Sequence, residues 1–166
     1  MSADAPTAAV SASPTAAADA AFMARALQLA RRGLYTTDPN PRVGCVIVRD
    51  GRIIGEGWHE RAGGAHAEIH ALQAAGEKAG GATAYVTLEP CCHHGRTPPC
   101  TDALIEARLA RVVFAVRDPN PRVDGEGAAR LAAAGIQVAC GLREREAAAL
   151  NVGFLQRMRI GRPWVR

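Results

Sequence analysis

From residue 67 onward the sequence alternates between helical and strand patterns, and this alternation restricts the fold more than any other feature. Stretches with helical periodicity are separated by short apolar runs of strand length. The helical stretches cover residues 67–79, 101–108, 127–134 and about 144–157, and the apolar runs cover 84–88, 111–116 and 136–140. Repeated helix–strand units place parallel strands in one sheet with helices on its faces, so we expect an α/β fold.

The segment before residue 67 predicts one further helix and a hairpin. The helical pattern begins at Asp19, which can serve as its N-cap. Two apolar runs, 43–48 and 52–58, flank Asp50-Gly51, a dipeptide typical of a two-residue turn between antiparallel strands. The complete pattern predicts a three-layer α/β/α sandwich around a mixed five-stranded sheet.

The chain has 166 residues, which is enough for one domain with short flanking segments. Residues 1–18 are almost entirely Ala, Ser, Thr, Pro and Asp and predict a disordered tail, whereas residues 19–153 form the expected folded domain. Sites in such folds lie at the carboxyl ends of strands, so we expect ligands near the loops after Leu88 and Val116.

Composition argues against several classes of protein. No apolar run approaches the roughly 18 residues of a membrane-spanning helix, and the N-terminus lacks the features of a secretory signal. The five cysteines do not form a disulfide pattern, so we expect a cytoplasmic protein in which the isolated Cys45 and Cys140 pack in the core. The net charge of +4 is scattered and only 4% of residues are aromatic, which argues against nucleic-acid binding.

A cluster of metal-binding residue types begins at His66-Ala67-Glu68 and continues with Pro90-Cys91-Cys92-His93-His94 and Cys100. Thiolate and imidazole are preferred zinc ligands, and three protein ligands with one open position are typical of a catalytic site. Zinc lowers the pKa of bound water to about 7, and a nearby carboxylate that is not a ligand can then move protons. The cluster therefore predicts a catalytic zinc site with Glu68 as its proton shuttle.

The spacing leaves the third zinc ligand open between Cys100 and His94, and Cys92 and His93 are also chemically able to bind zinc. Cys100 is the better candidate because it begins a predicted helix, where N–H groups favour a thiolate. The zinc-deaminase signature is His-x-Glu followed by Pro-Cys-x-x-Cys. Here the second cysteine comes after eight intervening residues rather than two.

Two other interpretations of the cluster are weaker. A structural zinc site closes all four positions with protein ligands and leaves Glu68 without a purpose. A pairing of His66 with His70 resembles zinc proteases in spacing, but those place glutamate directly after the first histidine.

The hexapeptide Asp-Pro-Asn-Pro-Arg-Val occurs twice, at 38–43 and at 118–123. One interpretation is a pair of Asx–Pro turns, which are common. The other is that flanking prolines hold the amides of Asn40 and Asn120 rigidly for ligand binding. The sequence by itself slightly favours the turns.

With these motifs the chain resembles the deaminase domain of the bacterial riboflavin-biosynthesis deaminase/reductases, a branch with a cytidine-deaminase-like fold. The resemblance covers about residues 22–166 and includes Gly95-Arg-Thr-Pro-Pro-Cys100, which separates this branch from ordinary cytidine deaminases. The resemblance implies zinc bound by His66, Cys91 and Cys100, with Glu68 as the catalytic proton shuttle. It also implies a substrate pocket, whose residues are Asn40, His59, His93, Arg96 and Asn120.

The implied reaction is hydrolytic removal of an amino group from a phosphorylated diaminopyrimidinone ribosylamine. The resemblance further implies a homo-oligomer, with residues 154–166 leading toward a reductase domain that this sequence lacks. A zinc deaminase for another nucleobase, nucleoside or pterin-like precursor is the main alternative, and a zinc-stabilised binding module without catalysis is a remote one.

Overall fold

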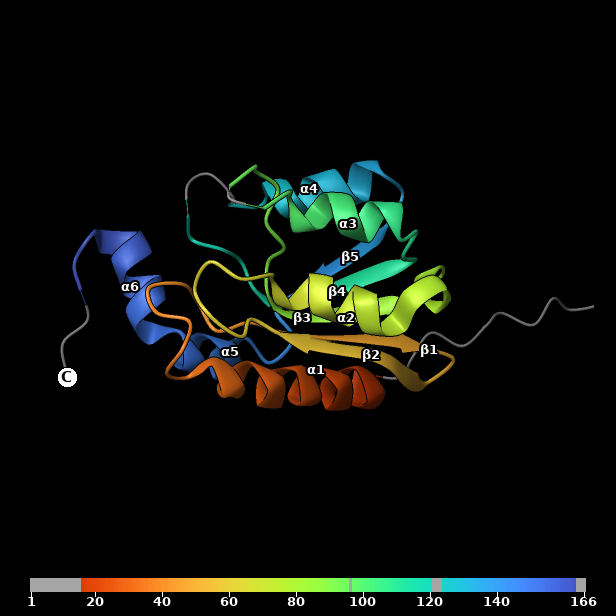
Figure 1. The fold of residues 1–166 in the computed structure, drawn as a ribbon, viewed down its shortest axis with the longest axis horizontal. Coiled ribbons are helices and arrows are strands. Elements are labelled where there is room, and N and C mark those ends of the chain that lie inside the picture. Colours follow the sequence, from red (N-terminus) through yellow and green to blue (C-terminus); the bar gives the residue numbers. More distant parts are fainter. Residues whose placement is uncertain (1–15, 96, 121–123, 164–166) are drawn as a thin grey trace, which may run out of the picture.

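The computed structural model describes residues 16–95, 97–120 and 124–163, which form a five-stranded sheet with helices on both faces (Figure 1). The strand order is β2-β1-β3-β4-β5. Strand β1 runs antiparallel to β2 and β3, whereas β3, β4 and β5 are parallel, so the mixed sheet is confirmed. The strands are β1 Gly44–Arg49, β2 Arg52–Trp58, β3 Thr83–Leu88, β4 Arg111–Val116 and β5 Gln137–Cys140.

Helices α1 and α5 cover one face of the sheet and α2, α3 and α4 cover the other, which confirms the three-layer sandwich (Figure 1). Successive strand residues enter opposite layers: Tyr85 packs on the α1 side and Val86 on the α2 side. Burial on both faces explains why the strands read as continuous apolar runs. The helices are α1 Ala16–Ala30, α2 Ala67–Ala75, α3 Cys100–Glu106, α4 Glu126–Ala133, α5 Glu144–Leu150 and α6 Val152–Ile160.

The hairpin between β1 and β2 forms as the sequence predicts. Asp50 and Gly51 both have positive φ, 51° and 71°, which matches the two central residues of a type I′ turn. The turn places Arg49 opposite Arg52, and β1 and β2 pair antiparallel from there.

Helix α2 lies directly on β2 because two glycines face it. A Cβ on Gly55 would stand 2.2 Å from the carbonyl oxygen of Ala71, and a Cβ on Gly57 would stand 2.3 Å from that of Ala67. Only glycine allows so close an approach. The first turn of α2, with His66 and Glu68, is thereby held against the sheet.

Helix α1 begins earlier than predicted, so the assignment of Asp19 as an N-cap is wrong. Ala16–Ala18 are helical, and alanine is the best helix former. The Asp19 carboxylate instead accepts hydrogen bonds from Tyr85 Oη at 2.6 Å and from the Arg111 guanidinium at 2.8 and 3.0 Å. The rest of the predicted tail, residues 1–15, lies outside the described residues.

The single helix predicted at 144–157 is also wrong. It is broken at Asn151 into α5 and α6, because the Asn151 side chain is committed to the backbone of Arg42. Helix α6 runs across the predicted boundary at 153–154, and the domain boundaries themselves stay a prediction.

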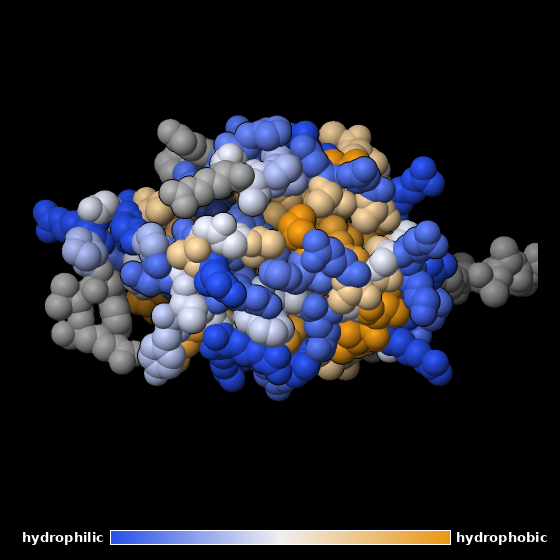
Figure 2. Space-filling view, viewed as in Figure 1, coloured by the Kyte–Doolittle hydropathy of each residue, from blue (hydrophilic) through white to orange (hydrophobic). Residues whose placement is uncertain are grey.

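The two isolated cysteines differ in their surroundings. Cys45 is fully buried in the core, as predicted, but Cys140 is exposed at the end of the edge strand β5, so its assignment to the core is wrong. Figure 2 shows a mostly polar face, with apolar side chains gathered over the half that holds the β1–β2 hairpin. Among the helices of the described residues, none combines the length and apolar character needed to cross a bilayer.

Candidate metal centre and active site

A cavity of about 560 Å³ opens at the carboxyl ends of β3 and β4. The fold class places ligands at this edge of the sheet. Its walls come from loops far apart in the sequence, and from α6 through Phe154. The polar and titratable residues that line it are Asn40, His59, His66, Glu68, Glu89, Cys91, His93, Thr97, Asp118 and Asn120.

Three potential metal ligands meet at this cavity. His66 Nδ1 lies 3.1 Å from Cys100 Sγ and 3.6 Å from Cys91 Sγ, and the three ligand atoms all lie within 4.8 Å of one another. Ligand atoms about 2.1–2.3 Å from a tetrahedral zinc ion stand roughly 3.6 Å apart, so this donor set fits zinc with one position left open. Within the described residues this is the group of His, Cys, Asp and Glu that could hold a metal, and it contains neither His94 nor His70.

Local structure explains why these three residues converge. His66 is the N-cap of α2, and Cys100 is the first residue of α3. Cys91 follows the end of β3, and its Sγ accepts a hydrogen bond from the Cys100 N–H at 3.2 Å. The starts of two helices and the end of one strand therefore surround the same point.

The three side chains of the cluster differ in how strongly they hold a proton. The hydrogen bond from the Cys100 thiol, together with the nearby His66, lowers the pKa of Cys91 to about 4. The same hydrogen bond raises the pKa of Cys100, and the contact with Cys91 raises that of His66. Zinc needs both thiolates and a neutral imidazole, so metal binding would release protons from this cluster.

Glu68 lies in the first turn of α2, lines the cavity, and is only 3% exposed. It is not among the three clustered ligands. Burial raises its pKa, which makes the carboxylate a better proton acceptor than one in water. Its position beside the ligand cluster suits proton transfer.

The first Asp-Pro-Asn-Pro loop brings Asn40 to the cavity next to His59. His59 Nδ1 donates to the carbonyl oxygen of Ala65 at 3.0 Å, so Nε2 is the acceptor that faces Asn40 Nδ2 at 3.5 Å. Burial lowers the pKa of His59, which favours the neutral ring. This wall therefore presents a neutral amide and a neutral imidazole.

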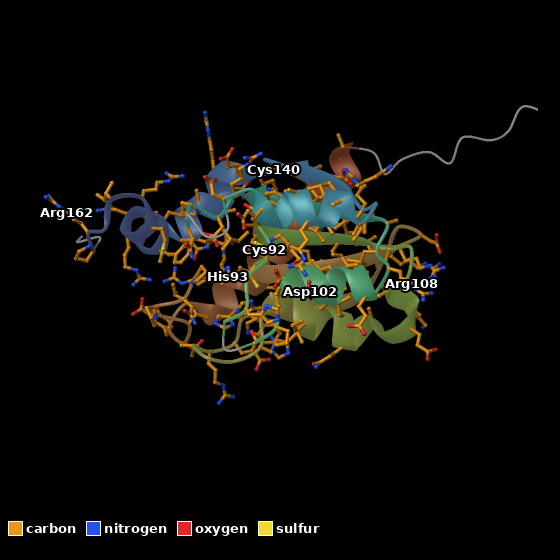
Figure 3. The ribbon with its side chains drawn as sticks, turned by 90° about the horizontal axis from the view of Figure 1, so that it is seen from above. Cys92, His93, Asp102, Arg108, Cys140 and Arg162 are labelled. Carbon is orange, nitrogen blue, oxygen red and sulfur yellow. The ribbon has the colours of Figure 1, made fainter. Side chains whose placement is uncertain are left out.

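The second loop, which begins at Asp118, also brings its asparagine, Asn120, to the cavity. The Asp118 carboxylate accepts the Asn120 N–H at 2.9 Å, so an Asx turn is present and the turn also presents its asparagine to the cavity. His93 lines the same wall, and Figure 3 shows it beside Cys92 in the middle of the molecule, apart from Cys140. Arg96 lies outside the described residues.

Glu89, Asp118 and Phe154 are among the cavity residues that the sequence analysis did not identify. Glu89, 3% exposed, accepts the backbone N–H groups of Asp118, Gly125 and Ala128, each at 3.2 Å, and so ties the end of β3 to the second loop and to α4. Glu89 could have been identified from the sequence, because it is an acidic residue directly after a predicted buried strand. Phe154 carried no signal, since only the fold brings α6 to the cavity.

Comparison with known proteins agrees with this geometry. The cytidine and deoxycytidylate deaminase zinc-binding region matches residues 16–116. The chain is 66% identical over 148 residues to riboflavin biosynthesis protein RibD of Escherichia coli. The match covers 89% of this chain but only 40% of that relative. It is 52% identical over 145 residues to the diaminohydroxyphosphoribosylamino-pyrimidine deaminase of Buchnera aphidicola, covering 87% of this chain and 99% of that one.

A solved structure supports the same grouping. The diaminohydroxyphosphoribosylaminopyrimidine deaminase/5-amino-6-(5-phosphoribosylamino)uracil reductase of Thermotoga maritima superposes with a TM-score of 0.85 at 46% identity, over 90% of this chain and 43% of that chain. The chain therefore belongs to the family defined by the cytidine and deoxycytidylate deaminase zinc-binding region, and within it to the diaminohydroxyphosphoribosylamino-pyrimidine deaminases.

Proposed function

We propose that the chain catalyses the hydrolytic deamination of 2,5-diamino-6-(5-phosphoribosylamino)pyrimidin-4(3H)-one to 5-amino-6-(5-phosphoribosylamino)uracil and ammonia, an early step of riboflavin biosynthesis. The observation that carries the reaction type is the cluster of His66, Cys91 and Cys100 at a cavity that the buried Glu68 also lines. The substrate is inferred from the relatives that carry this activity in their names.

Zinc would be held by His66, Cys91 and Cys100, whose two sulfurs and one nitrogen are a donor set typical of zinc. The chemistry that zinc supplies in such a site is activation of water at neutral pH. The family description names a zinc-binding region and supports this assignment.

Glu68 moves the protons. Its carboxylate takes one from the attacking water and delivers it to a ring nitrogen of the pyrimidine. A second transfer from the added hydroxyl to the amino nitrogen breaks the carbon–nitrogen bond, lets ammonia leave and forms a new carbonyl at that carbon. A buried carboxylate with a raised pKa holds a proton between these two transfers more readily than an exposed one.

The remaining cavity residues bind and orient the substrate. Asn40 and Asn120 supply amide donors and acceptors that suit the polar edges of a pyrimidine, and neutral His59 and His93 supply further polar atoms. Arg96 would grip the phosphate, because a guanidinium can bind phosphate oxygens in pairs.

The chain covers about 40% of its longer relatives, so the reductase activity in the name of one of them would belong to the part of that relative outside the match. No nicotinamide cofactor is then needed for the reaction proposed here. Homo-oligomer formation, a cytoplasmic location and the absence of a nucleic-acid partner remain predictions from the sequence.

The proposal is tested with Glu68→Gln. The variant should keep about one zinc ion per chain but lose about 10²–10⁴-fold in kcat for ammonia release, because an amide cannot carry the proton. Zinc content and ammonia release are measured on the same preparation. Glu77→Gln, the same substitution at an exposed position, is the matched control and should keep full activity. Near-full activity of Glu68→Gln would rule out the proton-shuttle role.

A further inference from the structure

The loop before Asn40 is anchored through Thr36 and Thr37, which hydrogen-bond to Gly33 and to the segment 60–62. The Asn40 N–H donates to the Thr37 carbonyl at 2.7 Å, and the side chain contacts His59 at 3.5 Å. The residue itself is exposed at the rim of the cavity. Asn40 lies at the end of this anchored segment, so its position also depends on what holds the backbone that follows it.

That backbone is held from the other end of the chain by Asn151. Asn151 Oδ1 accepts the Arg42 N–H at 2.8 Å and Asn151 Nδ2 donates to the Arg42 carbonyl at 2.8 Å, across 109 residues of sequence. The two bonds reproduce the pairing that a neighbouring antiparallel strand would give. Asn151 is only 6% exposed, so both bonds are shielded from water.

Helices α5 and α6, which meet at Asn151, make further contacts with this loop. Arg42 Nη1 donates to the Leu150 carbonyl at 2.7 Å, and the Arg157 guanidinium donates to the carbonyl of Pro39. Phe154 of α6 lines the cavity itself. Contacts from α5 and α6 thus reach the loop both before and after Asn40.

We propose that Asn151 is a positioning residue for Asn40, and that the junction of α5 and α6 is by this route part of the substrate pocket. The inference rests on the proposed function, in which Asn40 binds the pyrimidine. Asn151 touches neither the cavity nor the ligand cluster, so it acts on substrate binding and leaves the metal and Glu68 in place.

A double-mutant cycle of Asn151→Ala and Asn40→Ala tests this route. Asn151→Ala alone should raise KM for the deamination by about tenfold with kcat within about twofold, since a displaced binding group weakens ground-state and transition-state binding alike. In the Asn40→Ala background the same change should raise KM by less than about twofold. An equal rise in both backgrounds, or a fall in kcat with KM unchanged, would overturn the proposal.

The control is Tyr85→Phe, which removes a buried hydrogen bond to Asp19 at the opposite end of the sheet and should leave KM unchanged. A second readout is independent of activity: the Asn40 side-chain amide resonance in ¹H–¹⁵N spectra should shift in Asn151→Ala and not in Tyr85→Phe. An unshifted resonance contradicts the proposal even if the wild-type protein proves inactive on this substrate. If Asn151→Ala does not fold, Asn151→Ser, which can still accept a hydrogen bond, enters the same comparisons.

Discussion

At the scale of single residues, the candidate site depends on side chains that could carry the chemistry and on others that hold them in place. Residue type and short spacing identify His66, Glu68 and Cys91 as candidates for a metal site, because few other roles need those side chains together. Asn151 and Glu89 act on backbone groups that only the fold brings near them. No local sequence pattern predicts hydrogen bonds to backbone groups so far away in sequence.

The sequence predicts Asp19 to be a helix N-cap, but its carboxylate binds Arg111 and Tyr85 instead. Burial by itself would raise its pKa, but the hydrogen bonds from Arg111 and Tyr85 outweigh burial and lower it below the usual 3.8. A carboxylate with a lowered folded-state pKa contributes stability above its unfolded pKa, and that stability is lost as the pH falls through the folded value.

We therefore expect Asp19→Asn to lose about 2 kcal/mol of unfolding free energy near neutral pH, relative to wild type, and to close part of that gap below about pH 4. Urea unfolding at a series of pH values measures the difference. A gap that stays constant down to pH 2 would show that the Asp19 charge does not carry this stabilisation.

At the scale of elements, the positions of helices and strands follow from apolar periodicity, and their ends depend on tertiary contacts. The strand at 52–58 and the turn at Asp50-Gly51 form as predicted, because turn chemistry is local. The stretch 144–157, predicted as one helix, breaks at Asn151. The side chain at the break hydrogen-bonds to Arg42, which is more than a hundred residues away in sequence.

Glycines on β2 set the distance between α2 and the sheet, and so the position of the ligand cluster. Gly57→Ala would place a methyl group 2.3 Å from the Ala67 carbonyl oxygen. We expect it to destabilise the protein by about 1–3 kcal/mol and to weaken zinc retention, because α2 must move and His66 is its N-cap.

Thermal unfolding and zinc content measure both effects. Gly80→Ala is the matched control, because its nearest atom, the Ala107 carbonyl oxygen, would be 3.9 Å away and its φ of −55° suits alanine. Equal behaviour of the two variants would show that close packing at Gly57 does not position α2.

At the scale of the whole molecule, the three-layer sandwich and the mixed sheet could be predicted because alternating elements permit few arrangements. The order β2-β1-β3-β4-β5 brings the ends of β3 and β4 together at the cavity. What the pattern could not predict is that α6, near the end of the chain, also reaches that cavity through Phe154. Residues from Pro39 to Phe154 thereby contribute to one pocket.

We propose above that this pocket deaminates a phosphorylated diaminopyrimidinone. The most direct measurement is the kcat/KM for ammonia release by the purified protein on the diaminopyrimidinone ribosylamine phosphate, compared with cytidine and guanine. We expect the phosphorylated substrate to exceed both by at least about 10³-fold, because a site built for polar and charged groups rejects compounds that lack them. Activity on cytidine or guanine alone, or equal activity on all three, would contradict the claim.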